Sequence, residues 1–292
     1  MKKLYLSLTC LLLVFFCYGQ RSQKKNGFNQ SGRKADIFLH KQWWLGFKAG
    51  PNLSGVVVQT PYAVIAPVNY DVHTISKKYK NFRVAGSQVS FEVTFNFKGL
   101  SISLQPTYRT NRFSYQNNFA WSDIETPDNR LVLHYDQEQK TAYLDWPVMA
   151  KYEFSPRKIK PYIQAGLYSS LLLDATKSVR VSGTDYAAGG ANEFSNESII
   201  IGASDLFARY HWGFIAGGGF YYPLGNVRIN LDITYRHGMS NISSTENRYG
   251  SDRLSGVGDS LDDLKLNSIS VSAGCLFPLR FLGSGFRSMT DN

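Results

Sequence analysis

The segment Asn226–Gly238, NVRINLDITYRHG, alternates between apolar and polar residues without interruption. In a β-strand, successive side chains point to opposite faces, so the apolar residues of this segment share one face and the polar residues the other. The apolar face holds Val227, Ile229, Leu231, Ile233 and Tyr235, and the polar face holds Arg228, Asn230, Asp232, Thr234 and Arg236. An antiparallel sheet with one face in water would show this pattern. A β-barrel in lipid with a polar interior would show it as well.

Seven other stretches repeat this dyad pattern and are predicted to be strands. They cover residues 44–53, 89–97, 102–108, 144–154, 161–174, 212–222 and 269–277. The stretch 212–222 contains Gly217, Gly218 and Gly219, which inside a strand allow curvature or close packing. With the segment ending at Gly238, the sequence predicts eight strands.

The connections between these strands alternate in length. Short turns are expected at residues 98–99, 155–160 and 223–226, where Gly, Pro and Asn are suited to tight turns. Long polar loops are expected at roughly 59–79, 116–130, 183–206 and 242–264. Alternating short and long connections are typical of outer-membrane barrels, whose periplasmic turns are short and whose outer loops are long. We therefore predict an all-β, eight-stranded, antiparallel, up-and-down transmembrane β-barrel.

The N-terminus has the features of a secretory signal peptide. Lys2 and Lys3 precede an apolar run from Leu4 to Tyr18, and small residues flank a cleavage position before Gln20. A lipoprotein with Cys17 as the acylated residue is the alternative, but the bulky Phe15 and Phe16 fit it poorly. The expected organisation is a signal peptide at 1–19, a basic and disordered segment at 20–41, the barrel at 42–281 and a short tail at 282–292. After cleavage Cys275 is the single remaining cysteine, so no intrachain disulfide can form.

The net charge of +10 is concentrated at the N-terminus. Residues 1–41 carry eight Lys or Arg and one acidic residue, whereas the remainder carries 24 basic and 21 acidic residues. The body of the protein therefore lacks the basic character of a nucleic-acid-binding domain, and no nucleic-acid partner is expected. Past the signal peptide there is no apolar run of about 18 residues, so a membrane-embedded chain would have to cross with strands.

Aromatic residues make up 14% of the chain, and several gather near the expected short turns. An aromatic girdle at the membrane interface is expected there. Its members would be Phe154, Tyr162, Phe220, Tyr222, Phe277 and Phe281. Sliding the strand that carries Arg228 and Asp232 by one residue would turn those charges towards lipid. Each Arg at the bilayer midplane costs roughly 2–4 kcal/mol, so one register is strongly favoured.

Two neighbouring stretches, YLDWPVMAKYEF at residues 143–154 and KPYIQAG at 160–166, resemble the PorT-type outer-membrane β-barrel proteins of Bacteroidota. Three further stretches are similar: GFKAGPNLS at 46–54, AGGG with YPLG between 216 and 225, and YRHG at 235–238. Together they span about residues 43–281. The resemblance implies an eight-stranded barrel. It also implies that a role in type IX protein secretion, which some members have, is a candidate function.

Strand parity places a set of charged residues inside the predicted barrel. An eight-stranded barrel is just wide enough for side chains to fill it. Opposite charges at this density are expected to pair, because an unpaired buried charge is costly. A salt-bridged plug is therefore favoured over an ion or proton path. The predicted lumen charge network comprises Lys48, Glu92, Arg109, Asp145, Lys151, Arg228, Asp232 and Arg236, and Glu153 also points inward.

Candidates for catalysis are weak. His237 and Ser240 could suggest a lipid-cleaving pair, but parity separates them and no acid is placed to orient the histidine. His134 and His211 are interpreted as strand-end residues near the outer rim. The His and Cys residues lack metal-ligand spacing, and no cofactor is expected.

The sequence thus favours a non-enzymatic outer-membrane protein with a plugged polar lumen, acting as a structural or interaction component of the cell envelope. Its expected partners are outer-membrane lipid and, as candidates, other envelope or secretion proteins. The alternatives are an accessory component of type IX secretion and, least favoured, a lipid-modifying barrel enzyme.

Overall fold

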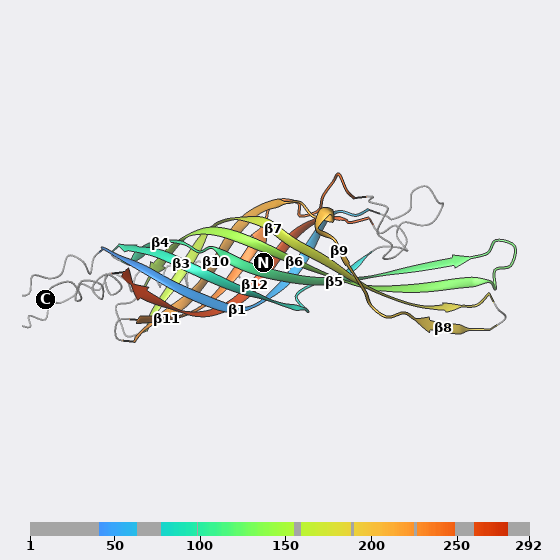
Figure 1. Cartoon of the computed structure of the whole chain (residues 1–292), viewed down its shortest axis with the longest axis horizontal. Helices are drawn as coiled ribbons and strands as arrows, with labels where there is room; N and C mark the ends of the chain where they lie inside the picture. Colours follow the sequence, from blue (N-terminus) through green and yellow to red (C-terminus); the bar gives the residue numbers. More distant parts are fainter. Residues whose placement is uncertain are drawn as a thin grey trace, which may run out of the picture.

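The computed structural model describes residues 41–62, 77–97, 99–154, 159–187, 190–224, 227–248 and 260–279. These residues form one antiparallel sheet of 12 strands and a short 3-10 helix, η3 (Ser204–Leu206) (Figure 1). The strands are β1 (Lys41–Thr60), β2 (Lys78–Lys80), β3 (Ala85–Phe97), β4 (Leu100–Leu104), β5 (Thr107–Ser122), β6 (Arg130–Glu153), β7 (Lys160–Asp185), β8 (Asn192–Ser195), β9 (Ile199–Gly202), β10 (Tyr210–Leu224), β11 (Val227–Gly238) and β12 (Asp263–Pro278).

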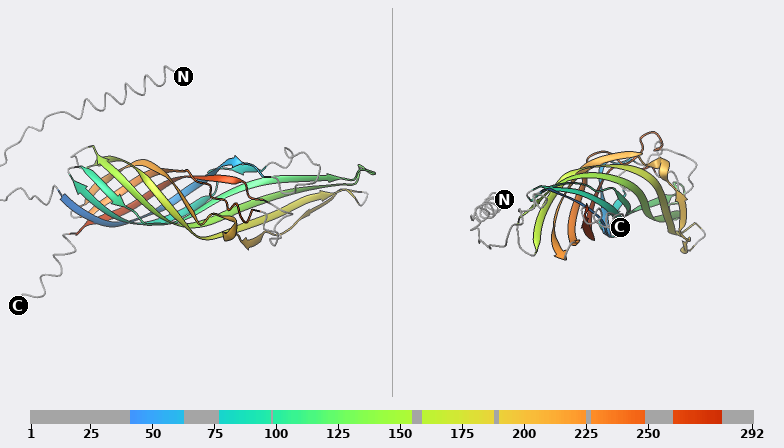
Figure 2. Two further views of the ribbon diagram at one scale, coloured as in Figure 1. Left: turned by 90° about the horizontal axis from the view of Figure 1, so that it is seen from above. Right: turned by 60° about the vertical axis from the view of Figure 1, so that its left-hand side comes forward.

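The strand pairs follow one another in a ring. β1 pairs with β3 on one side and with β12 on the other. From β12 the pairs continue through β11 and β10 to β7, and from β3 they continue through β4 and β5 to β6. Because β6 also pairs with β7, the order of pairs returns to its start. Figure 2 shows the strands of this sheet from two further sides, inclined to the long axis of the molecule. β4 and β5 both pair with β3 on one side and with β6 on the other, so together they count as one position in the ring. The ring therefore has eight positions, in agreement with the eight strands expected from the sequence.

The alternation in the sequence separates the two faces of this ring. In β11 the inward Asp232 is 1% exposed, whereas its outward neighbour Ile233 is 55% exposed. The same arrangement is found in β1, where Lys48 is buried and Phe47 is exposed. A water-soluble protein buries its apolar side chains and keeps charges outside. Polar inside and apolar outside is the arrangement of a barrel that faces lipid.

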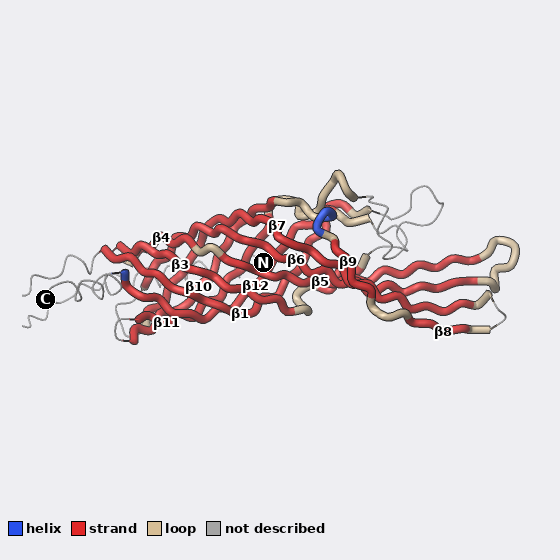
Figure 3. The backbone as a smooth tube through the Cα atoms, viewed as in Figure 1, coloured by secondary structure: helices blue, strands red, loops and turns tan. Residues whose placement is uncertain are grey.

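Three strands continue well beyond the ring. β10 pairs with β7 as far as Leu171, but the β6–β7 ladder runs on to Leu131 and Asp185. We call the continuing part the projecting sheet; it comprises residues 112–122 of β5, 130–141 of β6 and 175–185 of β7, with β8 and β9. It extends to the right of the ring in Figures 1 and 3.

The projecting sheet corrects the sequence-based loop predictions. Residues 116–130 and 183–206 were expected to be loops, but they contain the ends of β5, β6 and β7 together with β8 and β9. β12 likewise begins within the expected loop 242–264, and β2 lies at the end of the expected loop 59–79. Polar stretches such as residues 116–118 and 136–141 lack the apolar–polar alternation that marks the ring, and β8 and β9 are each only four residues long.

The outward face of β6 changes character where the strand leaves the ring. Its outward residues within the ring are apolar, and those of the projecting sheet from His134 to Lys140 are polar. A β-bulge at Ala142 and Tyr143 lies at this change. Since a charged residue on the lipid face is destabilising, the change marks where the lipid-facing surface ends. The apolar residues are Val148, Trp146 and Leu144, and the polar ones are Lys140, Glu138, Asp136 and His134.

Pro106 interrupts the predicted strand 102–108. The structure ends β4 at Leu104 and begins β5 at Thr107. Proline has no N–H to donate to a ladder, so a strand that contains it loses a hydrogen bond there. The break is held by neighbouring backbone groups: Phe91 N donates to Pro106 O at 2.9 Å, and Gln105 N donates to Pro147 O at 3.1 Å.

Glycines are required at a turn and at close contacts between strands. Gly99, between β3 and β4, has φ +86°, a conformation that glycine adopts without strain. A Cβ atom on Gly219 of β10 would lie 2.3 Å from Leu231 O, so a side chain there would collide with β11. The glycine-rich part of β10 thus allows close approach between strands, as the sequence suggested.

The predicted signal peptide at 1–19, the tail at 282–292 and Phe281 lie outside the described residues, as does all but Lys41 of the basic segment 20–41. Within the described ranges, no helix is long and apolar enough to cross a membrane.

Candidate functional site: the charged lumen

The inward residues of β6 mark successive layers of the lumen. From the short-turn end they are Glu153, Lys151, Met149, Pro147, Asp145 and Tyr143. Because every second residue of a strand points inward, about 6.6 Å separates consecutive layers. The charged residues predicted from the sequence fall into three of these layers.

Four charges meet in the layer of Lys151. Its ammonium group lies 2.5 Å from Glu92 Oε1, and Lys48 lies 3.7 Å from Glu92 Oε2 and 2.9 Å from Asp232 Oδ2. All four side chains are at most 5% exposed, and the two positive charges balance the two negative ones. Thr94 donates a further hydrogen bond to Glu92 at 2.7 Å. The layer is neutral and closely paired.

Three charges meet in the layer of Asp145. Arg109 Nε lies 2.8 Å from Asp145 Oδ2, and Arg236 Nε lies 3.9 Å from the same oxygen. The other carboxylate oxygen accepts a hydrogen bond from Ser170 at 2.6 Å. Arg236 also donates to Gln88 Oε1 at 3.1 Å. These groups are buried, and the layer contains one more positive than negative charge.

The third charged layer lies at the short-turn end. Arg228 Nη1 is 3.2 Å from Glu153 Oε1, which also accepts a hydrogen bond from Asn96 at 3.0 Å. The Arg228 guanidinium lies 3.9 Å from the centre of the Trp44 ring, a cation–π contact. All eight residues of the predicted lumen charge network, and Glu153, therefore lie on the inward face and take part in these ion pairs.

Two aromatic residues in contact with the layer of Lys151 were missed as lumen residues. Tyr162 and Tyr221 stack with ring centres 4.3 Å apart; Tyr162 donates to Asp232 at 3.2 Å, and the Tyr221 hydroxyl accepts from Lys151, also at 3.2 Å. Tyr162 was expected in the interfacial girdle, and this was wrong. Strand parity could have found it, because it shares a face with Gln164 two residues later.

His211 was expected to be a strand-end residue near the outer rim, and it is the second residue of β10. Its burial was not expected: it is 2% exposed and stacks on Tyr143, with ring centres 4.5 Å apart. Since β10 begins at Tyr210, a histidine at its second position can already point into the lumen. Met149, Tyr168 and Ile215 form an apolar cluster close by.

The end of the ring opposite the short turns is filled by apolar side chains. Leu206 of η3, with Phe207 and Ile242 from the connections, packs against inward residues of the strands. Ile242 N donates to Leu264 O at 2.8 Å, which fixes this connection to β12. The strand residues of this cluster are Val56, Phe113, Tyr143, Ala175, Leu264 and Leu266.

The two residues considered as catalytic candidates, His237 and Ser240, do not form a catalytic site. His237 points outward and lies beside Tyr235, while the Ser240 hydroxyl accepts a hydrogen bond from Trp212 N at 3.0 Å. The described contacts include no hydrogen bond between His237 and Ser240. Within the described ranges, no group of three or more His, Cys, Asp or Glu residues is arranged to hold a metal ion.

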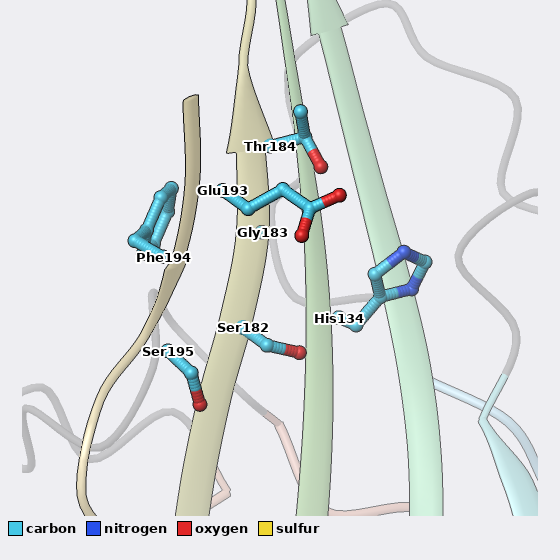
Figure 4. A pocket seen from close by; sticks show the side chains of 7 residues that line it. All are labelled: His134, Ser182, Gly183, Thr184, Glu193, Phe194 and Ser195. Atoms are coloured by element: carbon cyan, nitrogen blue, oxygen red, sulfur yellow. The ribbon is translucent and has the colours of Figure 1, made fainter. Parts of the chain in front are cut away.

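A shallow hollow of about 370 Å³ lies on the projecting sheet, lined by residues of β6, β7 and β8. His134 and Glu193 contribute polar side chains, and Figure 4 shows Phe194 apart from them. His134 Nδ1 lies 2.9 Å from Asn118 Oδ1. The hollow is separate from the lumen charge network, and His134, expected at a strand end, is the fifth residue of β6.

Comparison with known proteins places the chain in a family. No curated protein matches it. Among solved structures, Neisserial surface protein A is 13% identical, with 80% of this chain and 96% of that chain covered and a TM-score of 0.32. OprG from Pseudomonas aeruginosa is 12% identical, with 82% and 97% covered and a TM-score of 0.33. The family model described as "Outer membrane protein beta-barrel domain" matches residues 22–244, well over half of the chain. The chain therefore belongs to this family of β-barrel domains and is an outer-membrane protein.

Proposed function

We propose that the ring is a closed transmembrane β-barrel with a plugged lumen, and that the protein is a non-enzymatic structural or interaction component of the cell envelope. In this proposal the short turns face the periplasm. The projecting sheet and the long connections face the exterior.

The observation that carries the proposal is the packing of the lumen. Two adjacent ion-paired layers, at Glu153 and Lys151, are separated from the third, at Asp145, by Met149 and Pro147 along β6. An apolar cluster follows at the far end. Eight strands leave an interior that side chains can fill, whereas water-filled channels belong to larger barrels. A polar interior of this kind supports a stable anchor rather than a pore.

The outer surface supports contacts with lipid and with other envelope components. The apolar outward face of the ring suits outer-membrane lipid. The projecting sheet carries polar residues beyond that face, and the hairpin between β5 and β6 ends in the exposed Trp121 and Ile124. A hydrogen-bonded sheet that extends past the lipid is suited to reach other envelope proteins.

Recordings from planar bilayers test the plugged lumen. Purified protein inserted into the bilayer should give no steady conductance, with a large porin as the positive control. Steady, large ion conductance from the wild-type protein would contradict the proposal and favour transport.

Membership of the PorT-type group and a part in type IX secretion stay predictions from the sequence resemblance. No contact among the described residues favours them over the anchor. A lipid-modifying enzyme is disfavoured by the positions of His237 and Ser240. Deleting the gene and measuring the mass of the cell's lipid A tests this alternative, and we expect no change.

A further inference from the structure

The layer of Asp145 carries an uncompensated positive charge. Two guanidinium groups, from Arg109 and Arg236, share the single carboxylate of Asp145. The layer of Lys151 is neutral by itself and supplies no spare negative charge. An unpaired charge in a dry interior is strongly unfavourable, so a compensating negative charge is expected nearby.

Five residues beside this layer have side-chain nitrogen or hydroxyl groups that make no hydrogen bond of regular geometry to the residues that the structure describes. The groups are Arg109 Nη2, Asn111 Nδ2, the hydroxyls of Thr141 and Tyr143, and both ring nitrogens of His211. Each of these side chains is at most 2% exposed. We call them the donor cluster. Buried polar groups in native proteins are almost always satisfied, and unsatisfied ones point to bound water or an ion.

The members of the donor cluster are neighbours. Arg109 lies directly opposite Tyr143 in the β5–β6 ladder, and Asn111 lies opposite Thr141. All four point inward, and His211 stacks on Tyr143 from β10. Directly opposed residues in an antiparallel pair have Cβ atoms about 4.5–5.5 Å apart, so these groups can reach one ligand.

We propose that the donor cluster binds one monovalent anion of the size of chloride. Guanidinium, amide, hydroxyl and imidazole N–H groups all donate hydrogen bonds, as an anion requires. Water could satisfy the donors, but it would leave the extra positive charge uncompensated. A divalent anion would exceed the single charge to be balanced. The inference rests on the proposed plugged lumen, because an open aqueous lumen would hydrate the charge.

The first test compares the thermal unfolding of the purified full-length protein in sodium chloride and in sodium gluconate at equal ionic strength. A ligand bound by the folded state stabilises it by mass action, so the unfolding temperature should be higher in chloride and should rise with its concentration. Equal unfolding temperatures in the two salts would overturn the proposal.

Two variants separate the anion site from general salt effects. Tyr143→Phe removes one donor without changing charge, and the apparent chloride affinity should fall about tenfold or more. Tyr162→Phe, which removes a buried hydroxyl from the layer of Lys151, is the matched control and should keep the chloride dependence. An equal fall in apparent chloride affinity in both variants would overturn the proposal.

Asn111→Asp is the decisive variant because its carboxylate supplies a negative charge within the donor cluster and can replace the bound anion. The carboxylate can still accept the hydrogen bond that Ser54 donates to Asn111 Oδ1 at 3.0 Å. The unfolding temperature of this variant in gluconate should rise to the level that the wild type shows in chloride. The dependence of its unfolding temperature on chloride should disappear. A variant that keeps the wild-type dependence would overturn the proposal.

Crystals grown in sodium bromide locate the ion directly. One anomalous peak is expected beside Arg109 Nη2 and Tyr143 Oη. Water at that position without an anomalous signal would refute the anion. That result would leave the plugged lumen standing if bilayers show no conductance, so the two proposals can fail separately.

Discussion

At the scale of single residues, the lumen is defined by buried charges whose partners come from distant strands. Glu92 of β3 forms ion pairs with Lys151 of β6 and Lys48 of β1, so one carboxylate connects three strands. Removing one member of a buried pair leaves the other uncompensated, which costs more than removing both. This asymmetry makes the network testable by substitution.

Lys151→Met should lower the free energy of unfolding by about 3–5 kcal/mol, because Glu92 then keeps only the more distant Lys48. The double variant Lys151→Met with Glu92→Leu should lose less, since Lys48 retains Asp232 at 2.9 Å. Urea unfolding in lipid vesicles measures both changes.

The matched control is Lys140→Met, the same substitution on the same strand at an exposed position. It should change stability by no more than about 0.5 kcal/mol. If Lys151→Met is equally mild, the charges are solvated and the lumen is not dry.

At the scale of elements, the long strands β6 and β7 serve two environments. Within the ring their outward faces are apolar, and in the projecting sheet the same faces are polar. Hydrogen bonding is continuous along both parts, apart from the bulge at Ala142 and Tyr143. The change in side chains therefore marks the membrane boundary within a single strand.

Two substitutions on the outward face of β6 should therefore differ strongly in their effect on the stability of the folded protein. Val148, which is 53% exposed, lies within the ring, and Val148→Arg should destabilise the folded protein by about 2–4 kcal/mol in lipid. His134→Arg, on the same face of the projecting sheet, should change stability by no more than about 0.5 kcal/mol. Urea unfolding in lipid vesicles compares them, and equal costs would place the boundary elsewhere.

At the scale of the whole molecule, the two ends of the ring differ. One end has short turns such as the one at Gly99, and the other carries the projecting sheet (Figure 1). The orientation proposed above follows from this asymmetry, since outer-membrane barrels have short periplasmic turns.

Cysteine labelling tests that orientation in a Cys275→Ser background, where the introduced thiol is the one that reacts. Ile124→Cys, at a position 96% exposed in the hairpin of the projecting sheet, should react with an impermeant maleimide on intact cells. Ile159→Cys, near the start of β7, should react after the outer membrane is opened. The reverse result would mean that the barrel is inverted.

The sequence by itself determined the face of each ring strand. Alternation has a fixed period of two, so Lys48, Asp232 and Arg236 could be assigned to the interior without knowledge of their partners. Local turn chemistry also predicted the turn at Gly99. These features depend on near neighbours in the chain, which the sequence displays directly.

The tertiary structure alone decided which charges meet and how far the strands extend. Pairing of Lys151 with Glu92, or of Arg109 with Asp145, depends on strand order and stagger, which join residues far apart in the chain. Parts of the projecting sheet were missed because polar residues on both sides of a strand, as at 136–141, carry no apolar period. The burial of His211 was missed because where a strand enters the lumen depends on its ladder partners, whereas parity alone assigns Tyr162 to the inward face. Local pattern sets which way a side chain points, and long-range pairing sets what it meets.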